Sequence, residues 1–197
     1  MLATRNLGKI HEIKNMLRGM PIKILTYDGF ADLKEVREDG KTLKENAIKK
    51  AVAVARHTGF VSLADDSGLF VNALNGAPGV TSARFAGEHC SYEDNNRKLL
   101  KMLGEYPPSK RGARFCCVLA LAVPGGRIKT VQGVLKGWIG FELKGRHGFG
   151  YDPVFVVPSY EQTLAQLGLK IKNKISHRSL ALEKAKPLIK KLLMGIL

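Results

Sequence analysis

The sequence predicts an α/β protein with a mixed, twisted sheet and flanking helices. In the first half of the chain, short apolar runs typical of strands alternate with helical apolar stripes. In the second half, β-prone runs at 112–123 and 127–135 flank a Pro-Gly-Gly turn. This indicates a hairpin, and a third strand is expected at 138–143. No repeat or linker interrupts the pattern, so we expect one domain over residues 1–197.

Composition restricts the class of protein. A chain of 197 residues with 45% hydrophobic residues can bury a sizeable core. Its net charge of +15 favours phosphate-rich partners, either nucleic acid or nucleotides. The cysteines Cys90, Cys116 and Cys117 are odd in number and lack zinc-ligand spacing, which argues against disulfides and zinc. We expect no signal peptide and no membrane span, and therefore a cytoplasmic protein.

The chain begins with a strand–turn–helix segment. Residues 1–4 read as the end of a strand, and an apolar stripe predicts a helix over 8–18. The start of such a helix presents backbone N–H groups that favour bound phosphate, and Thr4, Asn6 and Lys9 add a hydroxyl, an amide and a cation. This is not a Walker A loop. The alternative is an ordinary turn between a strand and a helix.

A second strand is expected at 21–26, followed after a polar connection by a helix over 42–57. Thr42 and Glu45 have the spacing of a capping box at the start of this helix. Glu45 is expected on the packed face of the helix. Two interpretations of Glu45 stay open: it caps Thr42, or it is a metal ligand that reaches toward Asp66.

The most informative stretch is 64–69, Ala-Asp-Asp-Ser-Gly-Leu, which follows an apolar run at 60–63. Successive strand side chains point to opposite faces, so Asp65 and Asp66 are not expected to do the same job. Carboxylates at the end of a strand suit Mg²⁺ or the activation of a water molecule. The alternative is a turn stabilised by aspartate, without chemistry.

Further along, Ser91 is expected to cap a helix that ends near residue 103. The glycine-rich stretch 145–153 holds Phe149, Tyr151 and Asp152 in a backbone that can approach a ligand closely. Its aromatic rings could stack on a purine, or they could simply pin a turn between strands. No helix follows it directly, so it is not a dinucleotide-binding fingerprint.

The last helix is predicted to begin after Ser176, which places His177 and Arg178 in its first turn. Cations are disfavoured there by the helix dipole, unless an anion or a polar ligand docks at that end. A solvated basic helix explains the later lysines, but it explains Lys172, His177 and Arg178 less well.

Taken together, these motifs resemble the inosine/xanthosine triphosphate pyrophosphatase family, hydrolases that remove non-standard purine nucleotides. The motifs occur in the family's order over nearly the whole chain: Ala3-Thr4-x-Asn6-x-Gly8-Lys9, Thr42-Leu43-x-Glu45-Asn46-Ala47, Ala64 to Leu69, Gly76 to Gly79, Ser82-Ala83-Arg84, Gly148 to Pro153 and Ser176-His177-Arg178.

The resemblance implies two lobes around a central substrate cleft, in a homodimer. The implied reaction is Mg²⁺-dependent hydrolysis of ITP, dITP or XTP to the monophosphate and pyrophosphate. The partner is then a purine nucleoside triphosphate, and neither a membrane nor a nucleic acid is expected.

The resemblance also assigns roles by position. Thr4, Asn6 and Lys9 would hold the triphosphate, and Ser67 would contact the substrate. Asp66 would be the proton acceptor and, with Glu45 and Asp65, would bind Mg²⁺. An aspartate that ligates Mg²⁺ loses basicity, so the division of work between Asp65 and Asp66 stays open. The nucleoside pocket would consist of Phe149, Gly150, Tyr151, Asp152, Lys172, His177 and Arg178.

Two other functions compete with this reading. A basic nucleic-acid-binding protein would explain the charge of +15 but would leave the aspartate pair without a role. A pyrophosphatase of the Maf type, acting on modified pyrimidine nucleotides, would require a Ser-x-x-Arg-Arg start that this chain lacks.

Overall fold

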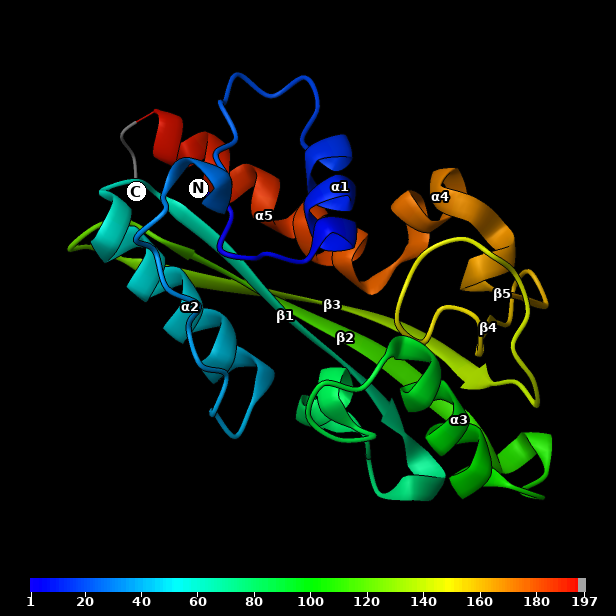
Figure 1. The fold of residues 1–197 in the computed structure, drawn as a ribbon. Helices are drawn as coiled ribbons and strands as arrows, with labels where there is room; N and C mark the ends of the chain where they lie inside the picture. Colours follow the sequence, from blue (N-terminus) through cyan, green and yellow to red (C-terminus); the bar gives the residue numbers. More distant parts are fainter. Residues whose placement is uncertain (195–197) are drawn as a thin grey trace. The chain divides into compact units, whose positions relative to one another are not determined.

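The computed structural model describes residues 1–194 and has the predicted mixed α/β composition (Figure 1). Its helices and strands are α1 (Leu7–Met16), α2 (Leu43–Thr58), β1 (Ser62–Val71), α3 (Tyr92–Leu103), β2 (Gly112–Ala122), β3 (Ile128–Ile139), β4 (Phe155–Val157), β5 (Gln162–Thr163), α4 (Leu164–Ile175) and α5 (His177–Leu193).

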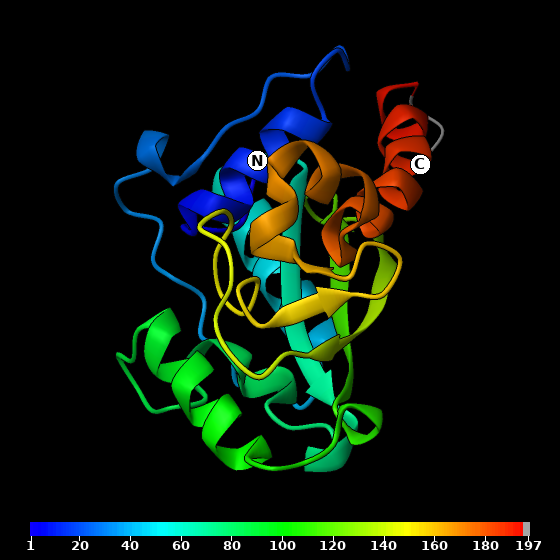
Figure 2. The ribbon, with the colours of Figure 1, turned by 90° about the vertical axis from the view of Figure 1, so that its right-hand side faces the viewer.

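The sheet has five strands in the order β1-β2-β3-β4-β5. The pairs β3–β4 and β4–β5 are antiparallel, with Trp138 opposite Val156 and Val156 opposite Thr163. A parallel bridge from Leu2 to Leu63 adds the first residues of the chain beside β1. Helix α4 packs against β4 and β5 (Figure 2).

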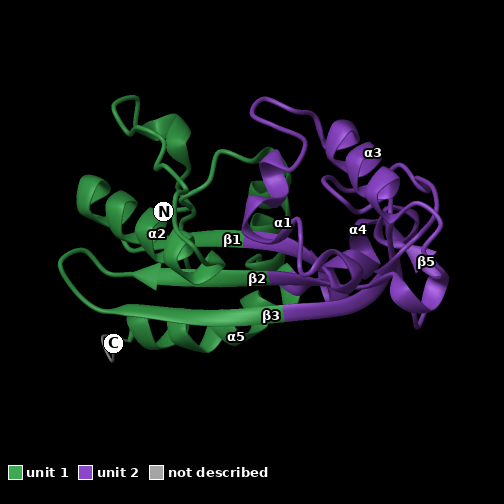
Figure 3. Cartoon of the chain, turned by 90° about the horizontal axis from the view of Figure 1, so that it is seen from below, with its two compact units in different colours: residues 1–66, 117–133, 178–197 green, residues 67–116, 134–177 purple. Residues whose placement is uncertain are grey.

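The chain forms two compact units, coloured separately in Figure 3. The strands β1, β2 and β3 each contribute residues to both units. Unit 1 comprises residues 1–66, 117–133 and 178–197, and unit 2 comprises residues 67–116 and 134–177.

In unit 1, alternate side chains of the strands enter different layers. Leu63 and Leu119 face a core formed with Ile13 of α1 and with Ala181 and Leu182 of α5. Helix α2 lies on the other side of the sheet (Figure 1). The two faces of β1 therefore meet different helices, which decides the surroundings of its polar residues.

In unit 2, the core is built around Phe155, whose ring lies 4.6 Å from that of Phe115. Leu99 of α3 and Leu164 of α4 are fully buried in the same cluster. The predicted cap forms at Ser91, which accepts from Asp94 N at the start of α3, and Thr163 accepts from Gln166 N at the start of α4. These caps determine where each helix begins.

Three expectations about strands are wrong. The aspartate pair lies inside β1 and not at its end, because ion pairs compensate both buried carboxylates and the strand continues. The run 21–26 forms no strand, although Leu25 O accepts a hydrogen bond from Leu2 N at 2.9 Å. The runs at 127–135 and 138–143 are not two strands: residues 128–139 form one strand, β3, and residues 140–143 lie outside it. Gly137 does not break it, because a Cβ there would lie 2.3 Å from Val156 O, so the glycine permits close pairing with β4.

Within the described residues, none of the helices combines the length and the apolar character needed to cross a bilayer. The longest, α5, alternates buried Ala181, Leu182 and Ala185 with exposed lysines. Such a helix is the amphipathic cover of a protein core.

Candidate active site

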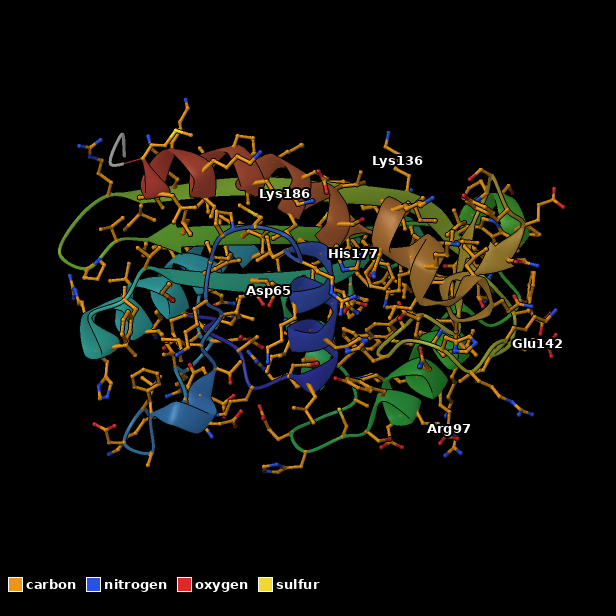
Figure 4. All side chains as sticks on the ribbon, turned by 90° about the horizontal axis from the view of Figure 1, so that it is seen from above. Asp65, Arg97, Lys136, Glu142, His177 and Lys186 are labelled. Carbon is orange, nitrogen blue, oxygen red and sulfur yellow. The ribbon has the colours of Figure 1, made fainter. Side chains whose placement is uncertain are left out.

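Asp65 is a buried carboxylate held by cations from two helices. Lys9 of α1 places its Nζ 3.0 Å from Oδ2, and Arg178 of α5 places Nε and Nη2 at 3.4 Å from the same oxygen. Figure 4 shows Asp65 beside α1. Burial alone would raise the pKa of Asp65, but Lys9, Arg178 and Lys50 outweigh it and hold this pKa well below its usual range. Asp65 is therefore ionised at neutral pH.

Glu12 is a second buried carboxylate of this cluster, and its role was missed from the sequence. It is 3% exposed and forms an ion pair with Nη1 of Arg178. Burial tends to lower the pKa of Arg178, but the charges of Asp65 and Glu12 have the larger effect. The pKa of Arg178 is therefore raised above its ordinary value. The sequence did contain a signal for Glu12. It follows Lys9 by three residues, and side chains three apart lie on the same side of a helix. Glu12 and its neighbour Ile13 are the buried residues of α1.

Asp66 points to the other face of β1 and meets α2. Asn46 Nδ2 donates to its Oδ2 at 3.1 Å, and Lys50 Nζ lies 3.7 Å from Oδ1. Burial, assisted by the charge of Glu38, raises the pKa of Asp66 to about 6 even though Lys50 opposes the shift. The two side chains leave β1 on opposite faces, as predicted, and that they do different jobs stays a prediction.

Lys50 connects the acidic groups on the α2 side, and it too was missed. Its Nζ donates to Asp65 O at 2.6 Å and forms an ion pair with Glu38. Burial lowers the pKa of Lys50, but Asp65, Asp66 and Glu38 raise it by more, so it remains charged. The signal for Lys50 was its position on the buried face of α2. Because a lysine is rarely buried without a partner, such a position indicates a nearby carboxylate.

The cluster has an excess of negative charge. Its carboxylates are Glu12, Glu38, Asp65 and Asp66, against the cations Lys9, Lys50 and Arg178. Oxygen donors with one surplus charge fit a hard cation such as Mg²⁺. Across residues 1–194, however, no three acidic, histidine or cysteine side chains converge in a ready metal-ligand geometry.

The expectation that Glu45 lies on the packed face of its helix is wrong. The buried face of α2 is formed by Leu43, Asn46, Ala47, Lys50, Ala51, Val54 and Ala55, and Glu45 is exposed. Thr42 accepts from Glu45 N as a cap should, and the Glu45 carboxylate accepts from Lys41 N at 2.7 Å. The residue that meets Asp66 is the neighbouring Asn46.

The turn at Thr4 and Asn6 is organised as the start of a helix. Asn6 caps α1 by accepting from Lys9 N at 3.1 Å, and Thr4 Oγ1 accepts from Asn6 N at 3.2 Å. The Lys9 side chain remains 16% exposed while it contacts Asp65. A cation and a positive helix end therefore lie together, as the sequence predicted for a phosphate site.

In unit 2, the glycine-rich loop presents Phe149 above a buried ion pair. Asp152 accepts from Phe149 N at 2.9 Å and forms an ion pair with Lys172. Lys172 Nζ lies 4.5 Å from the centre of the Phe149 ring, and the ring of Tyr92 lies 6.1 Å away. An aromatic face beside a lysine is suited to a flat base that carries hydrogen-bond acceptors.

The other predicted residues of the nucleoside pocket have structural contacts. Tyr151 is buried, which raises its pKa, and its hydroxyl donates to Ser82 O at 2.8 Å. His177 stacks on Phe115 with ring centres 4.5 Å apart. Ser67 is half-buried, next to Asp66 in the chain.

The structure sorts the predicted residues into two sets. Lys9, Asp65 and Arg178 come together in unit 1, while Asp66 lies on the opposite face of β1. In unit 2, Phe149 contacts both Asp152 and Lys172. Arg178, expected among the base contacts, is 1% exposed and pairs with Glu12 and Asp65.

Comparison with known proteins gives consistent results. A dITP/XTP pyrophosphatase of Desulforamulus reducens is 52% identical over 192 residues, covering 98% of this chain and 96% of that protein. The dITP/XTP pyrophosphatase of Bacillus subtilis is 46% identical, covering 96% of each chain. The solved structure of a HAM1 protein from Coxiella burnetii is 41% identical, with a TM-score of 0.88, covering 96% of this chain and 97% of that one.

A model of the Ham1 family matches residues 1–188, nearly the entire chain. The site residues of both units fall within this match. The chain therefore belongs to the Ham1 family.

Proposed function

We propose that this protein hydrolyses non-standard purine nucleoside triphosphates, namely ITP, dITP and XTP, to the monophosphate and pyrophosphate. The observation that carries the proposal is the aspartate pair of β1, with one carboxylate held ionised among cations and the other with a pKa near neutrality. Relatives that match this chain from end to end are named dITP/XTP pyrophosphatases, which supports the same substrate class.

In the proposed reaction, a water oxygen attacks the α-phosphorus and the bond from that phosphorus to the bridging oxygen of the β-phosphate breaks. Without metal the pKa of Asp66 is about 6, so this carboxyl is largely ionised at neutral pH, and it accepts the proton that the water loses. Mg²⁺ on the same carboxylate would lower its basicity, so the roles of ligand and base compete at Asp66. Asn46 and Lys50 hold the carboxylate in place. Pyrophosphate leaves with the bridging oxygen, and the protein is not covalently modified.

Asp65 has a positioning role in this scheme. Its ion pair with Lys9 orients the ammonium beside the start of α1, where we propose that Thr4, Asn6 and Lys9 bind the triphosphate. Ser67, which directly follows the aspartate pair, is proposed as a substrate contact. Pre-oriented positive charge lowers the barrier because charge builds up on the phosphate oxygens during attack.

We propose Mg²⁺ as the cofactor, bound by Asp66 and Glu45, with Asp65 and Glu38 contributing to the charge around it. When bound, Mg²⁺ would neutralise phosphate oxygens and increase the acidity of a coordinated water. Glu45 would have to give up its contact with Lys41 N, which is an exposed hydrogen bond of low cost.

For the base, we propose stacking on Phe149 and hydrogen bonding of the 6-keto oxygen by donors from Lys172 or His177, with Gly150, Tyr151 and Asp152 shaping the pocket. Adenine carries an amino donor at this position, so the same donors disfavour ATP.

The proposal is tested by measuring pyrophosphate release from ITP, XTP, GTP and ATP, each with and without Mg²⁺. We expect fast Mg²⁺-dependent turnover of ITP and XTP, and slow turnover of ATP. Guanine also carries a 6-keto oxygen, so slow turnover of GTP would require crowding near its 2-position. Equal turnover of all four would contradict the proposed base recognition. Absence of turnover, together with oligonucleotide affinity that falls steeply with salt, would favour the nucleic-acid-binding alternative.

We also propose a homodimer that acts in the cytoplasm, where free nucleotides are found. In unit 2, Trp138, Phe141 and Val156 help line a cavity of about 160 Å³, and Phe141 is 55% exposed. A second copy could cover this apolar surface. Light scattering should give the dimer mass for the wild type and a monomer for Phe141→Glu. A monomeric wild type would contradict the dimer, and a dimeric variant would place its interface elsewhere.

A further inference from the structure

The first turns of α3 lie directly beside the glycine-rich loop of unit 2, as both views of the ribbon show (Figures 1 and 2). Two side chains on one face of α3, at positions i and i+4, make the contacts. The ring of Tyr92 lies 6.1 Å from that of Phe149 at an angle of 38°, and Asn96 Nδ2 donates to Gly150 O at 2.9 Å. Thus α3 contacts both the aromatic side chain and the backbone of the loop.

We propose that Tyr92 is a further base-binding residue, extending the aromatic surface of Phe149 that the purine contacts. This inference rests on the proposed function. Lys172 Nζ lies over the Phe149 ring, and Tyr92 offers the same ring a second, tilted neighbour. A planar base that stacks on Phe149 then meets an aromatic surface on α3 as well as the lysine.

The environment of Tyr92 favours ligand contact over core packing. Its side chain is 45% exposed, so its ring area is not fully used by the fold. Its position is nevertheless well defined, because the capping box of Ser91 and Asp94 fixes the turn in which Tyr92 is the first helical residue. An ordered and partly exposed tyrosine supplies a large flat contact at little cost in conformational entropy.

Asn96 supports this role by holding the loop in register with α3. It is 2% exposed, and its hydrogen bond to Gly150 O ties the residue after Phe149 to the helix. Gly150 has a φ of +65°, a backbone conformation that benefits from such a tie. The separation of the two aromatic rings is therefore set by the helix and not by the loop alone.

Aromatic stacking on a base is strong enough to measure. By the usual magnitude of one base–aromatic stack, removing the Tyr92 ring should weaken binding of a purine nucleotide by roughly 5- to 100-fold. Ligands without a base should be unaffected, and the chemical step should change little. The signature is a rise in KM for ITP with kcat within about twofold of the wild type.

The experiment compares Tyr92→Ala and Tyr92→Phe with Tyr106→Ala, a matched control that removes another partly exposed tyrosine of the same unit. For each protein, kcat and KM are measured with ITP, together with inhibition constants for IMP and for inorganic tripolyphosphate. Thermal unfolding confirms that each variant is folded. We expect Tyr92→Ala to raise KM and the IMP inhibition constant while the tripolyphosphate constant stays the same. Tyr106→Ala should match the wild type, and Tyr92→Phe, which keeps the ring, should recover most of the affinity that Tyr92→Ala loses.

An unchanged KM in Tyr92→Ala would overturn the inference. An equal weakening of IMP and tripolyphosphate would also overturn it, because Tyr92 would then only support the fold. Failure of the wild type to hydrolyse ITP or XTP would instead contradict the proposed function, so the two failures are distinguishable.

Discussion

Asp66→Asn is expected to reduce pyrophosphate release from ITP by roughly 10²- to 10⁴-fold, the usual contribution of a general base. The amide keeps the size of the carboxylate and can still accept from Asn46, but it cannot take a proton from water. Steady-state assays at saturating Mg²⁺ and near neutral pH measure the loss. A variant with activity within tenfold of the wild type would contradict the assignment of Asp66 as proton acceptor.

The same variant should be more stable than the wild type when metal is removed by a chelator. The pKa of Asp66 is about 6 in the folded protein against an ordinary 3.8, so the folded state binds this proton more tightly. Above about pH 6 the ionised, buried carboxylate destabilises the fold, by at most about 3 kcal/mol, and below about pH 4 this penalty disappears. Lys9, Lys50, Glu38 and Asn46 are the groups that act on this carboxylate.

Urea unfolding at several pH values checks the sign. The gain in the free energy of unfolding from Asp66→Asn should be largest near pH 8 and should vanish as the pH falls toward 4. A gain that grows toward acid would contradict a raised pKa. A site that costs stability in return for chemistry is a common feature of enzymes.

Glu12→Gln is expected to lower the free energy of unfolding by about 3–5 kcal/mol, the usual cost of breaking a buried ion pair. The guanidinium of Arg178 is nearly inaccessible to water, and Glu12 neutralises it together with Asp65. Without the Glu12 charge, Arg178 must compete with Lys9 for the single carboxylate of Asp65. Urea unfolding with a fixed concentration of chelator measures the change.

Glu183→Gln is the matched control for Glu12→Gln. Glu183 pairs with Lys186 at 2.6 Å on the exposed face of α5, and its loss should cost less than about 1 kcal/mol. Equal effects of the two variants would mean that burial adds nothing to the Glu12 pair. A Glu12 variant as stable as the wild type would mean that Asp65 alone suffices to neutralise Arg178.

The sequence was sufficient to predict most helices and the division of the aspartate pair. Apolar stripes and caps are local, so α1, α2 and α3 begin within a residue or so of the expected positions. The alternation of strand side chains is also local, and it separates Asp65 from Asp66 without knowledge of their partners. The resemblance added the order of the motifs, which singled out Lys9, Lys172 and Arg178.

The partners of these residues could not be predicted, because they depend on tertiary packing. Glu12 and Arg178 are 166 positions apart in the chain, and their ion pair exists only once α1 and α5 cover the same face of the sheet. Glu38 lies in a segment without regular structure, where periodicity offers no signal. The predicted strands stop before Gly137 and before the aspartate pair, whereas close pairing with β4 and compensating charges keep both strands continuous.

The passage of β1 through both aspartates has a consequence for how the chain tolerates length changes. Deleting Ala64 would shift the strand by one residue from that point, so that Asp66 would take the place beside Lys9 and Arg178, and Ser67 the place beside Asn46 and Lys50. The net charge would not change, yet neither carboxylate would keep the surroundings that set its pKa. The difference in pKa between the two aspartates thus depends on which face of β1 each side chain occupies, and not on the residue type.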